Sequence, residues 1–186
     1  MRAEANRLRV LDFDIETRLI GFHKGGRFAP DGCEPIAIAW SWCNPHAVTA
    51  HVGPSKRMLR EFAKAYAEAD MVTGHYIRKF DLLVLNGAMI ENGLPLLRQK
   101  LTLDTKGDLV AFAGLSKSQE NLSEMLELAE AKYHMSDVKW REAARLKKNG
   151  RDETIRRVVD DVVQHMELRE ALTTEGLLRG PRVWAP

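Results

Sequence analysis

The sequence predicts an α/β fold in which a mixed central sheet is flanked by helices. Short apolar strands dominate the first half of the 186 residues, while amphipathic helices separate the later strands and fill the second half. Helices that intervene between strands have to cover the faces of the sheet, because each element buries one apolar side. At this length we expect a single domain, with its core at about 8–172 and a C-terminal tail at 173–186.

Five segments have the composition of strands, in which β-branched and aromatic residues are bounded by turn residues. They are 8–16, "PIAIAWSW" at 35–42, "AVTAHV" at 47–52, "MVTGH" at 71–75 and "KLTLDT" at 100–105. The turn "CNPH" joins the second and third. The Gly-rich residues 19–34 are expected to form a loop.

Helices are predicted where apolar residues recur every three or four positions. Ser55 is a suitable N-cap for the first helix, and Gly93 a suitable end for the second, which covers 80–93. Further helices are expected near 107–113, 119–131 and 137–147, followed by a long one from about 152 to 172.

The composition is that of an ordinary globular protein, with 45% hydrophobic and 29% charged residues. A net charge of +2 is too mild to indicate a nucleic-acid partner by itself. Two cysteines do not make a disulfide framework, and no apolar run approaches the length of a membrane span. Since the first residues do not resemble a signal peptide either, we expect a cytoplasmic protein without membrane contact.

The first strand carries three acids at alternate positions, Asp12, Asp14 and Glu16. Alternate side chains of a strand point to the same face, so the three carboxylates lie together, opposite Leu11 and Phe13. An exposed face is one explanation. Because a first strand that is followed by a hairpin and helices is usually central, we favour a site for a hard cation such as Mg²⁺ or Mn²⁺, which prefers oxygen ligands.

Two more acids are candidates for the same site. Asp81 stands near the start of an apolar helix, where it also gains from the helix dipole. On a helical wheel of the last helix, Asp161 lies on a side that continues the apolar surface, whereas Asp160 lies with Gln164 on the solvated side. Asp161 is therefore the better candidate for a buried site.

Three segments, "FDIET", "GHYIRKFD" and "VVDDVVQHMEL", resemble the three motifs of the DEDD superfamily of 3′–5′ exonucleases, which have a ribonuclease-H-like fold. The residues that carry the resemblance are Asp14, Glu16, Thr17, Gly74, His75, Phe80, Asp81, Asp161, Val162 and Leu168. The motifs occur in the family's order and span about residues 8–172.

The resemblance implies a 3′–5′ exonuclease that hydrolyses the 3′ end of single-stranded or frayed DNA. It implies two divalent cations, Mg²⁺ or Mn²⁺, held by four catalytic carboxylates, Asp14, Glu16, Asp81 and Asp161. The expected substrate-binding residues are Thr17, Arg18, Leu19, His75, Phe80, Arg157 and His165. The chain shows no polymerase region, so we expect it to work alone or as a separate subunit whose partner is a polymerase or replication protein.

Two positions depart from the family pattern. Tyr76 replaces the Asn of the second motif, and Arg157 and Arg156 stand where the third motif has its Tyr or His. Three explanations remain open: Arg157 contacts the scissile phosphate, His165 assists the attacking water, or activity is largely lost. The alternatives to a DNA exonuclease are an RNase of the same superfamily and a catalytically weakened module that binds nucleic acid or a polymerase.

Overall fold

A computed structural model describes residues 8–20, 29–53, 55–111, 114–128 and 135–186. These residues form one six-stranded sheet in the order β3-β2-β1-β4-β5-β6. The strands are β1 (Val10–Leu19), β2 (Cys33–Ser41), β3 (Thr49–Val52), β4 (Met71–Gly74), β5 (Lys100–Asp104) and β6 (Arg182–Trp184). Since β1 is antiparallel to β2 and parallel to β4, the sheet is mixed. The predicted α/β class is confirmed, and the arrangement is consistent with a ribonuclease-H-like fold.

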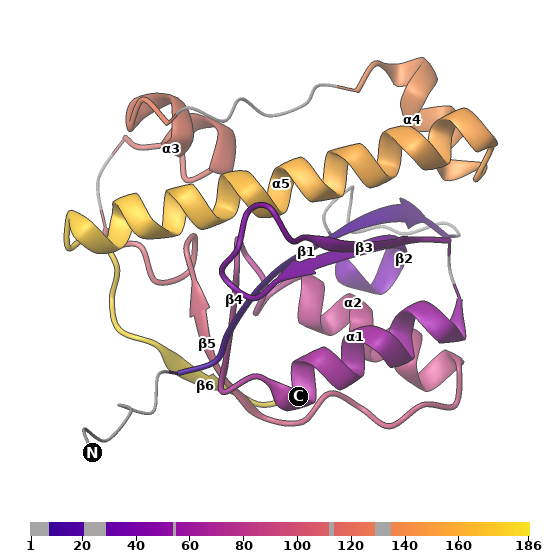
Figure 1. Cartoon of the computed structure of the whole chain (residues 1–186), viewed down its shortest axis with the longest axis horizontal. Helices are drawn as coiled ribbons and strands as arrows, with labels where there is room; N and C mark the ends of the chain where they lie inside the picture. Colours follow the sequence, from indigo (N-terminus) through magenta and orange to yellow (C-terminus); the bar gives the residue numbers. More distant parts are fainter. Residues whose placement is uncertain (1–7, 21–28, 54, 112–113, 129–134) are drawn as a thin grey trace.

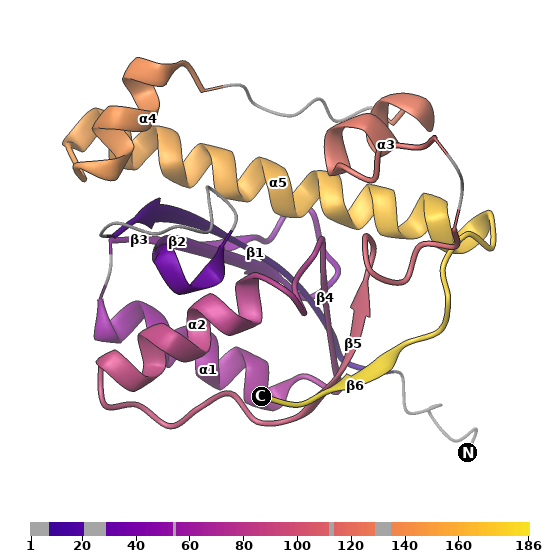
Figure 2. The same ribbon diagram turned by 180° about the vertical axis from the view of Figure 1, so that it is seen from behind.

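Helices cover both faces of this sheet (Figures 1 and 2). They are η1 (Pro30–Gly32), a short 3₁₀ turn, and the α-helices α1 (Lys56–Glu68), α2 (Asp81–Glu91), α3 (Gln119–Met125), α4 (Asp137–Ala144) and α5 (Lys148–Thr174). The helices α1 and α2 lie on one face, and the long α5 crosses the other. No helix in the described residues has the length and apolar character needed to cross a membrane.

Several local predictions hold. The Ser55 hydroxyl accepts a hydrogen bond from Met58 N at 3.1 Å, which caps α1 as expected. Gly93 follows the end of α2 with a φ of +61°, a conformation that glycine adopts without strain. The turn at 43–46 separates β2 from β3.

Four local predictions are wrong. The first strand extends to Leu19 and α5 begins at Lys148, so both elements are longer than expected. The helix predicted near 107–113 is absent from its described part, 107–111. Here the Asp104 carboxylate accepts hydrogen bonds from the N–H groups of Lys106 and Gly107, which favours a turn over a helix. The helix predicted near 119–131 is shorter than expected, because α3 ends at Met125 and residues 126–128 are not helical. Residues 112–113 and 129–131 of the two predicted helices lie outside the described part.

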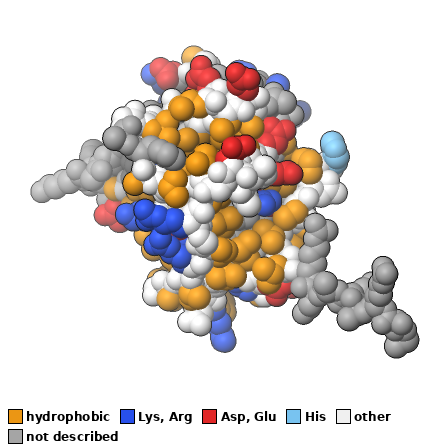
Figure 3. All heavy atoms as spheres, turned by 90° about the vertical axis from the view of Figure 1, so that its left-hand side faces the viewer, with side chains coloured by type: hydrophobic (Ala, Val, Ile, Leu, Met, Phe, Trp, Pro, Cys, Tyr) orange, Lys and Arg blue, Asp and Glu red, His pale blue; other side chains and the backbone are white. Residues whose placement is uncertain are grey.

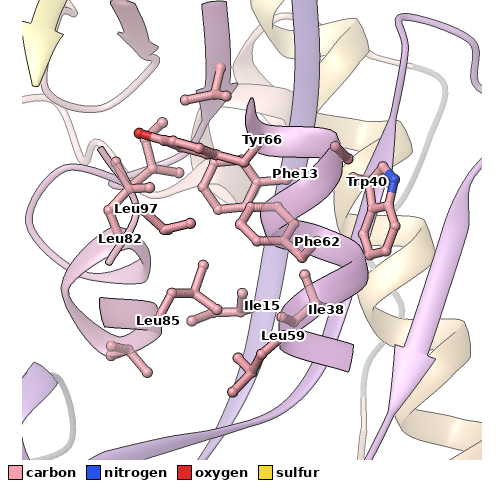
Figure 4. Close-up of a cluster of buried hydrophobic side chains, with 14 of the residues drawn as sticks. Phe13, Ile15, Ile38, Trp40, Leu59, Phe62, Tyr66, Leu82, Leu85 and Leu97 are labelled. Carbon is pink, nitrogen blue, oxygen red and sulfur yellow. The ribbon is translucent and has the colours of Figure 1, made fainter. Parts of the chain in front are cut away.

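The larger core lies between the sheet and the pair α1 and α2 (Figure 4). Phe13 of β1 packs on Phe62 of α1 with ring centroids 5.0 Å apart. Trp184 of β6 is 7% exposed and joins the same core, so the tail packs on its own chain. This core packs against one face of β1 and so fixes the position of the strand. The opposite face of β1, which carries the acids, is thereby held in place as well.

On the other face, α5 packs closely on β2 because β2 presents two alanines there. Ala37 and Ala39 contact Val158, Val162 and Met166 of α5 in a second buried cluster. These alanines pair with Glu16 and Asp14 across the β1–β2 ladder. Small side chains beside the acids therefore let the helix approach β1.

On the face shown in Figure 3, apolar side chains cover much of the centre, acidic side chains lie mostly in the upper half, and a group of basic side chains lies at the left.

Candidate functional site

The alternation predicted for β1 is present in the structure. Leu11, Phe13 and Ile15 point into the core under α1 and α2. On the opposite face, Asp12 contacts α5 through Arg169, and Glu16 does so through Arg157. The face of β1 that carries acids is thus covered by α5 and is not an open surface.

Three of the four predicted carboxylates come together. Asp14, Glu16 and Asp161 offer oxygen atoms that all lie within 4.8 Å of one another, and we call them the carboxylate cluster. Three formal negative charges are thus held close together in a partly buried region of the protein. Such an arrangement costs free energy unless a cation compensates the charges. The cluster thus has the donor type and proximity of a site for a hard cation.

The structure also separates the two neighbouring acids of α5 as predicted. The Asp161 side chain is 6% exposed, whereas that of Asp160 is 37% exposed. The helical wheel predicts Gln164 on the solvated side, but the residue is only 2% exposed. The reason is α3, whose Gln119 Nε2 donates to Gln164 Oε1 at 3.1 Å and to Asp161 O at 3.0 Å.

Arg157 of α5 reaches directly into the carboxylate cluster. Its Nε lies 2.8 Å from Asp161 Oδ2 and 3.1 Å from Glu16 Oε1, and its side chain is 11% exposed. Burial by itself lowers the pKa of Arg157, but the charges of Asp161, Glu16 and Asp14 outweigh it, so the pKa is raised. The guanidinium is therefore a permanent cation beside all three carboxylates.

Asp81 lies at the first position of α2 and is 4% exposed. Its carboxylate is hydrogen-bonded to the backbone of Asp81 itself and of Ile15, the residue between the two β1 members of the cluster. Burial raises the pKa of Asp81 to about 7, and the charge of Asp104 adds to this shift. Asp81 is thus next to β1, but it is not one of the three carboxylates whose oxygens gather within 4.8 Å.

The glycine of the second motif, Gly74, stands where segments of the chain approach one another closely. A Cβ on Gly74 would stand 2.7 Å from Phe13 O and would also clash with the Ile77 side chain. The next residue, His75, has its Nδ1 2.9 Å from Thr105 Oγ1. The motif therefore holds the end of β4 against β1 and brings the start of α2 to the site.

A second polar network contacts α5 one to two helical turns after the carboxylate cluster. Asp12, which is 0% exposed, accepts hydrogen bonds from Arg169 Nε at 2.8 Å and Arg169 Nη2 at 3.1 Å. His165 Nε2 stands 3.1 Å from Thr73 Oγ1 and 3.5 Å from Asp12 Oδ1, with 1% of the residue exposed. Burial keeps the pKa of His165 well below its usual value, and the charge of Arg169 acts in the same direction. The structure thus places His165 with Asp12 and not in the carboxylate cluster.

The remaining predicted substrate-binding residues lie around the end of β1 and the start of α2. A register shift between Glu16 and Thr17 re-aims the last residues of β1, and Leu19 at its end is 58% exposed. Arg18 pairs with Glu34 at 2.7 Å and donates to Ala144 O at 3.2 Å, which ties β1 to α4. Phe80 packs against the larger core.

Sequence reasoning missed that Asp12 and Arg169 form a pair and that Arg157 faces the acids of β1. A signal for both exists in the sequence. Residues 157, 161, 165 and 169 of α5 recur every fourth position, and they form one stripe that matches the row of acids on β1. The spacing predicts the stripe, but it does not tell which strand the stripe contacts.

The fold is shared with part of a larger protein. The solved structure of the family B DNA polymerase from the hyperthermophilic archaeon Pyrobaculum calidifontis superposes with a TM-score of 0.65 and 18% sequence identity. The similarity covers 90% of this chain and 25% of the polymerase chain, so the chain spans about a quarter of its length. At this identity the likeness shows the fold alone. No protein-family model and no curated protein sequence matches the chain.

Proposed function

We propose that this protein is a metal-dependent 3′–5′ exonuclease that hydrolyses phosphodiester bonds at the 3′ end of single-stranded or frayed DNA. The observation that carries the proposal is the carboxylate cluster of Asp14, Glu16 and Asp161, assembled from the first and third motifs at the centre of the sheet. The similarity in fold to a DNA polymerase structure supports a substrate of the nucleic-acid class.

The cluster fits a hard divalent cation such as Mg²⁺ or Mn²⁺, because its donors are all carboxylate oxygens within 4.8 Å of one another. That the site holds two such cations is part of the proposal and rests on the resemblance to the DEDD exonucleases. Asp14, Glu16 and Asp161 would hold the cations, with Asp14 in the middle of β1 as the central ligand and Asp81 as the proposed fourth. Bound cations of this kind lower the pKa of a water and stabilise the charge that develops on the phosphoryl oxygens.

The chain's own residues position the substrate in this proposal. Glu16, nearer the exit of β1, orients the attacking water. Thr17 and Leu19 lie where β1 ends and contact the terminal nucleoside, and the exposed Leu19 is well placed for that. The contacts of His165 with Asp12 and Thr73 favour a structural part for this side chain over one in moving a proton.

One observation favours a second candidate, a weakened module that binds nucleic acid without cutting it. Arg157 stands where the DEDD exonucleases that this chain resembles have their Tyr, and it pairs with two of the three carboxylates. An arginine cannot accept a proton at neutral pH, so it cannot replace a general base. Binding without turnover would result if the pairs persist when nucleic acid is bound.

A nuclease assay separates these candidates. Single-stranded DNA and RNA, labelled at the 3′ or the 5′ end, are incubated with the protein in MgCl₂, MnCl₂ or EDTA. We expect shortening from the 3′ end of DNA that requires the cation and is lost in Asp14→Ala, while circular dichroism shows an unchanged fold. Binding of DNA without any shortening in both cations would instead establish the second candidate, and faster shortening of RNA would establish an RNase.

A further inference from the structure

The guanidinium of Arg157 occupies the place where the carboxylate cluster needs positive charge. It forms ion pairs with Glu16 and Asp161, and all three side chains are nearly enclosed, with 11%, 12% and 6% exposure in the order Arg157, Glu16, Asp161. Two separate elements supply these acids, so the arginine links β1 to α5. Such a contact is more than a surface ion pair along a helix.

The charges indicate what the arginine does for the cluster. Three ionised carboxylates carry a formal charge of −3, and Arg157 reduces it to −2. The buried acids would repel one another strongly without this cation, since like charges in a poorly hydrated place are costly. The protein therefore contains its own counter-ion for the site.

The oxygens that pair with the arginine belong to the carboxylates that a metal ion would use. Glu16 Oε1 and Asp161 Oδ2 face the Nε–H of Arg157, and a hard cation would need carboxylate lone pairs of the same groups. A guanidinium at this distance would also repel a divalent cation. Arg157 and a metal ion therefore each make it less favourable for the other to occupy the carboxylate cluster.

The arginine has a second partner that does not involve the cluster. The ring of Trp140 on α4 lies 5.9 Å from Arg157 Cζ, within the range of a cation–π attraction. A guanidinium that moved away from the carboxylates would still have this aromatic partner and the solvent at the site's edge. The displaced position is consequently not an isolated buried charge.

We propose that Arg157 is a resident cation of the carboxylate cluster that competes with divalent metal ions, so that metal binding displaces its side chain. The inference rests on the proposed function, because it concerns the same metal site. Arg157 stabilises the metal-free protein and weakens its affinity for Mg²⁺ and Mn²⁺. The displaced guanidinium then lies beside the site, where a substrate phosphate can accept its hydrogen bonds.

The test compares Mn²⁺ binding to the wild type, Arg157→Met and Arg156→Met, by the electron paramagnetic resonance signal of free Mn²⁺. Arg156 is the matched control, since it is the neighbouring arginine of α5, is 64% exposed and pairs with Asp160 at 3.8 Å. We expect Arg157→Met to bind Mn²⁺ at least about 10-fold more tightly than the wild type, and Arg156→Met to match the wild type. The metal-free Arg157→Met protein should also melt at a lower temperature than the wild type. Added Mn²⁺ should raise the melting temperature of this variant more than that of the wild type.

A second measurement uses the wild type alone and decides the matter even where Arg157→Met fails to fold. In a nitrogen-15 NMR titration with MgCl₂, the Nε–H resonance of Arg157, identified by its absence from Arg157→Lys, should shift and exchange faster with water. The proposal is overturned where Mg²⁺ shifts the amides of Asp14 and Asp161 while this resonance stays unchanged. Equal Mn²⁺ affinity of wild type and Arg157→Met likewise overturns it and leaves the metal site intact. Absence of Mn²⁺ binding in both proteins overturns the proposed function itself.

Discussion

Replacing Arg169 with Met removes both strong hydrogen bonds of a carboxylate that has no access to water. Asp12 is 0% exposed and accepts hydrogen bonds from Arg169 at 2.8 and 3.1 Å. Among the described residues, the substitution leaves this buried charge with the thiol of Cys43 at 3.4 Å and the ring of His165 at 3.5 Å. Breaking a buried ion pair on one side costs about 3–5 kcal/mol. Because the Arg169 side chain keeps 20% exposure, we expect the lower end, about 3 kcal/mol.

The pH dependence of this cost has a definite sign. Burial raises the pKa of Asp12 above its usual value, and the charge of Arg169 opposes that rise. Without Arg169 the pKa rises further, so the folded variant binds a proton over a pH range in which the unfolded chain does not. The free energy of unfolding of the variant then falls with increasing pH, and the cost of the substitution is greater at pH 8 than at pH 5.

Urea unfolding followed by circular dichroism, in EDTA, measures this cost for Arg169→Met, Asp12→Asn and the double variant. The double variant should lose less than the sum of the two single losses, by at least about 1 kcal/mol, since the neutral amide of Asn needs no counter-charge. Arg156→Met serves as the surface control. A loss below about 1 kcal/mol for Arg169→Met, or the same loss with and without Asp12, would refute the reasoning.

Three more predictions follow from the site and its supports. Asp161→Asn should lower kcat/KM for labelled DNA by at least about 100-fold, while Asp160→Asn stays near the wild type; the opposite order would show that the register of α5 in the site is wrong. Burial gives Asp81 a pKa of about 7 against 3.8 unfolded, so metal-free wild type loses stability as the pH rises through this window. The gain in melting temperature from Asp81→Asn in EDTA should therefore be larger at pH 8 than at pH 5, and an equal gain at both would contradict the shift. A Cβ on Gly150 would clash with the backbone of α4, so Gly150→Ala should cost about 1–3 kcal/mol in urea, whereas Gly180→Ala, which has open space, should cost far less.

Much of the site was predictable because it depends on local periodicity. A strand must alternate its side chains, so Asp14 and Glu16 had to share a face once β1 was recognised. A helix of 3.6 residues per turn separates Asp161 from Asp160 in the same way, and their exposures of 6% and 37% confirm it. The sheet class followed from the alternation of strands and helices along the chain.

Some features were beyond such reasoning even within one segment. The helix expected near 107–113 gives way to a turn in its described part, because the Asp104 carboxylate captures two backbone N–H groups there. The periodicity of the segment does not report this competition. The strand β6 was missed as well, since a segment of three residues has too few positions to show an alternation.

The sequence by itself determined which residues carry charge and which neighbours share a face of one strand or helix. It did not determine which charges meet, because the partners are distant in the chain: 141 positions separate Arg157 from Glu16, and 157 separate Arg169 from Asp12. Only the packing of α5 on β1, which the alanines of β2 make possible, decided that an arginine lies inside the carboxylate cluster. The physical reason is that helical and strand periods act over a few residues, whereas burial and ion pairing depend on which faces the whole fold presses together.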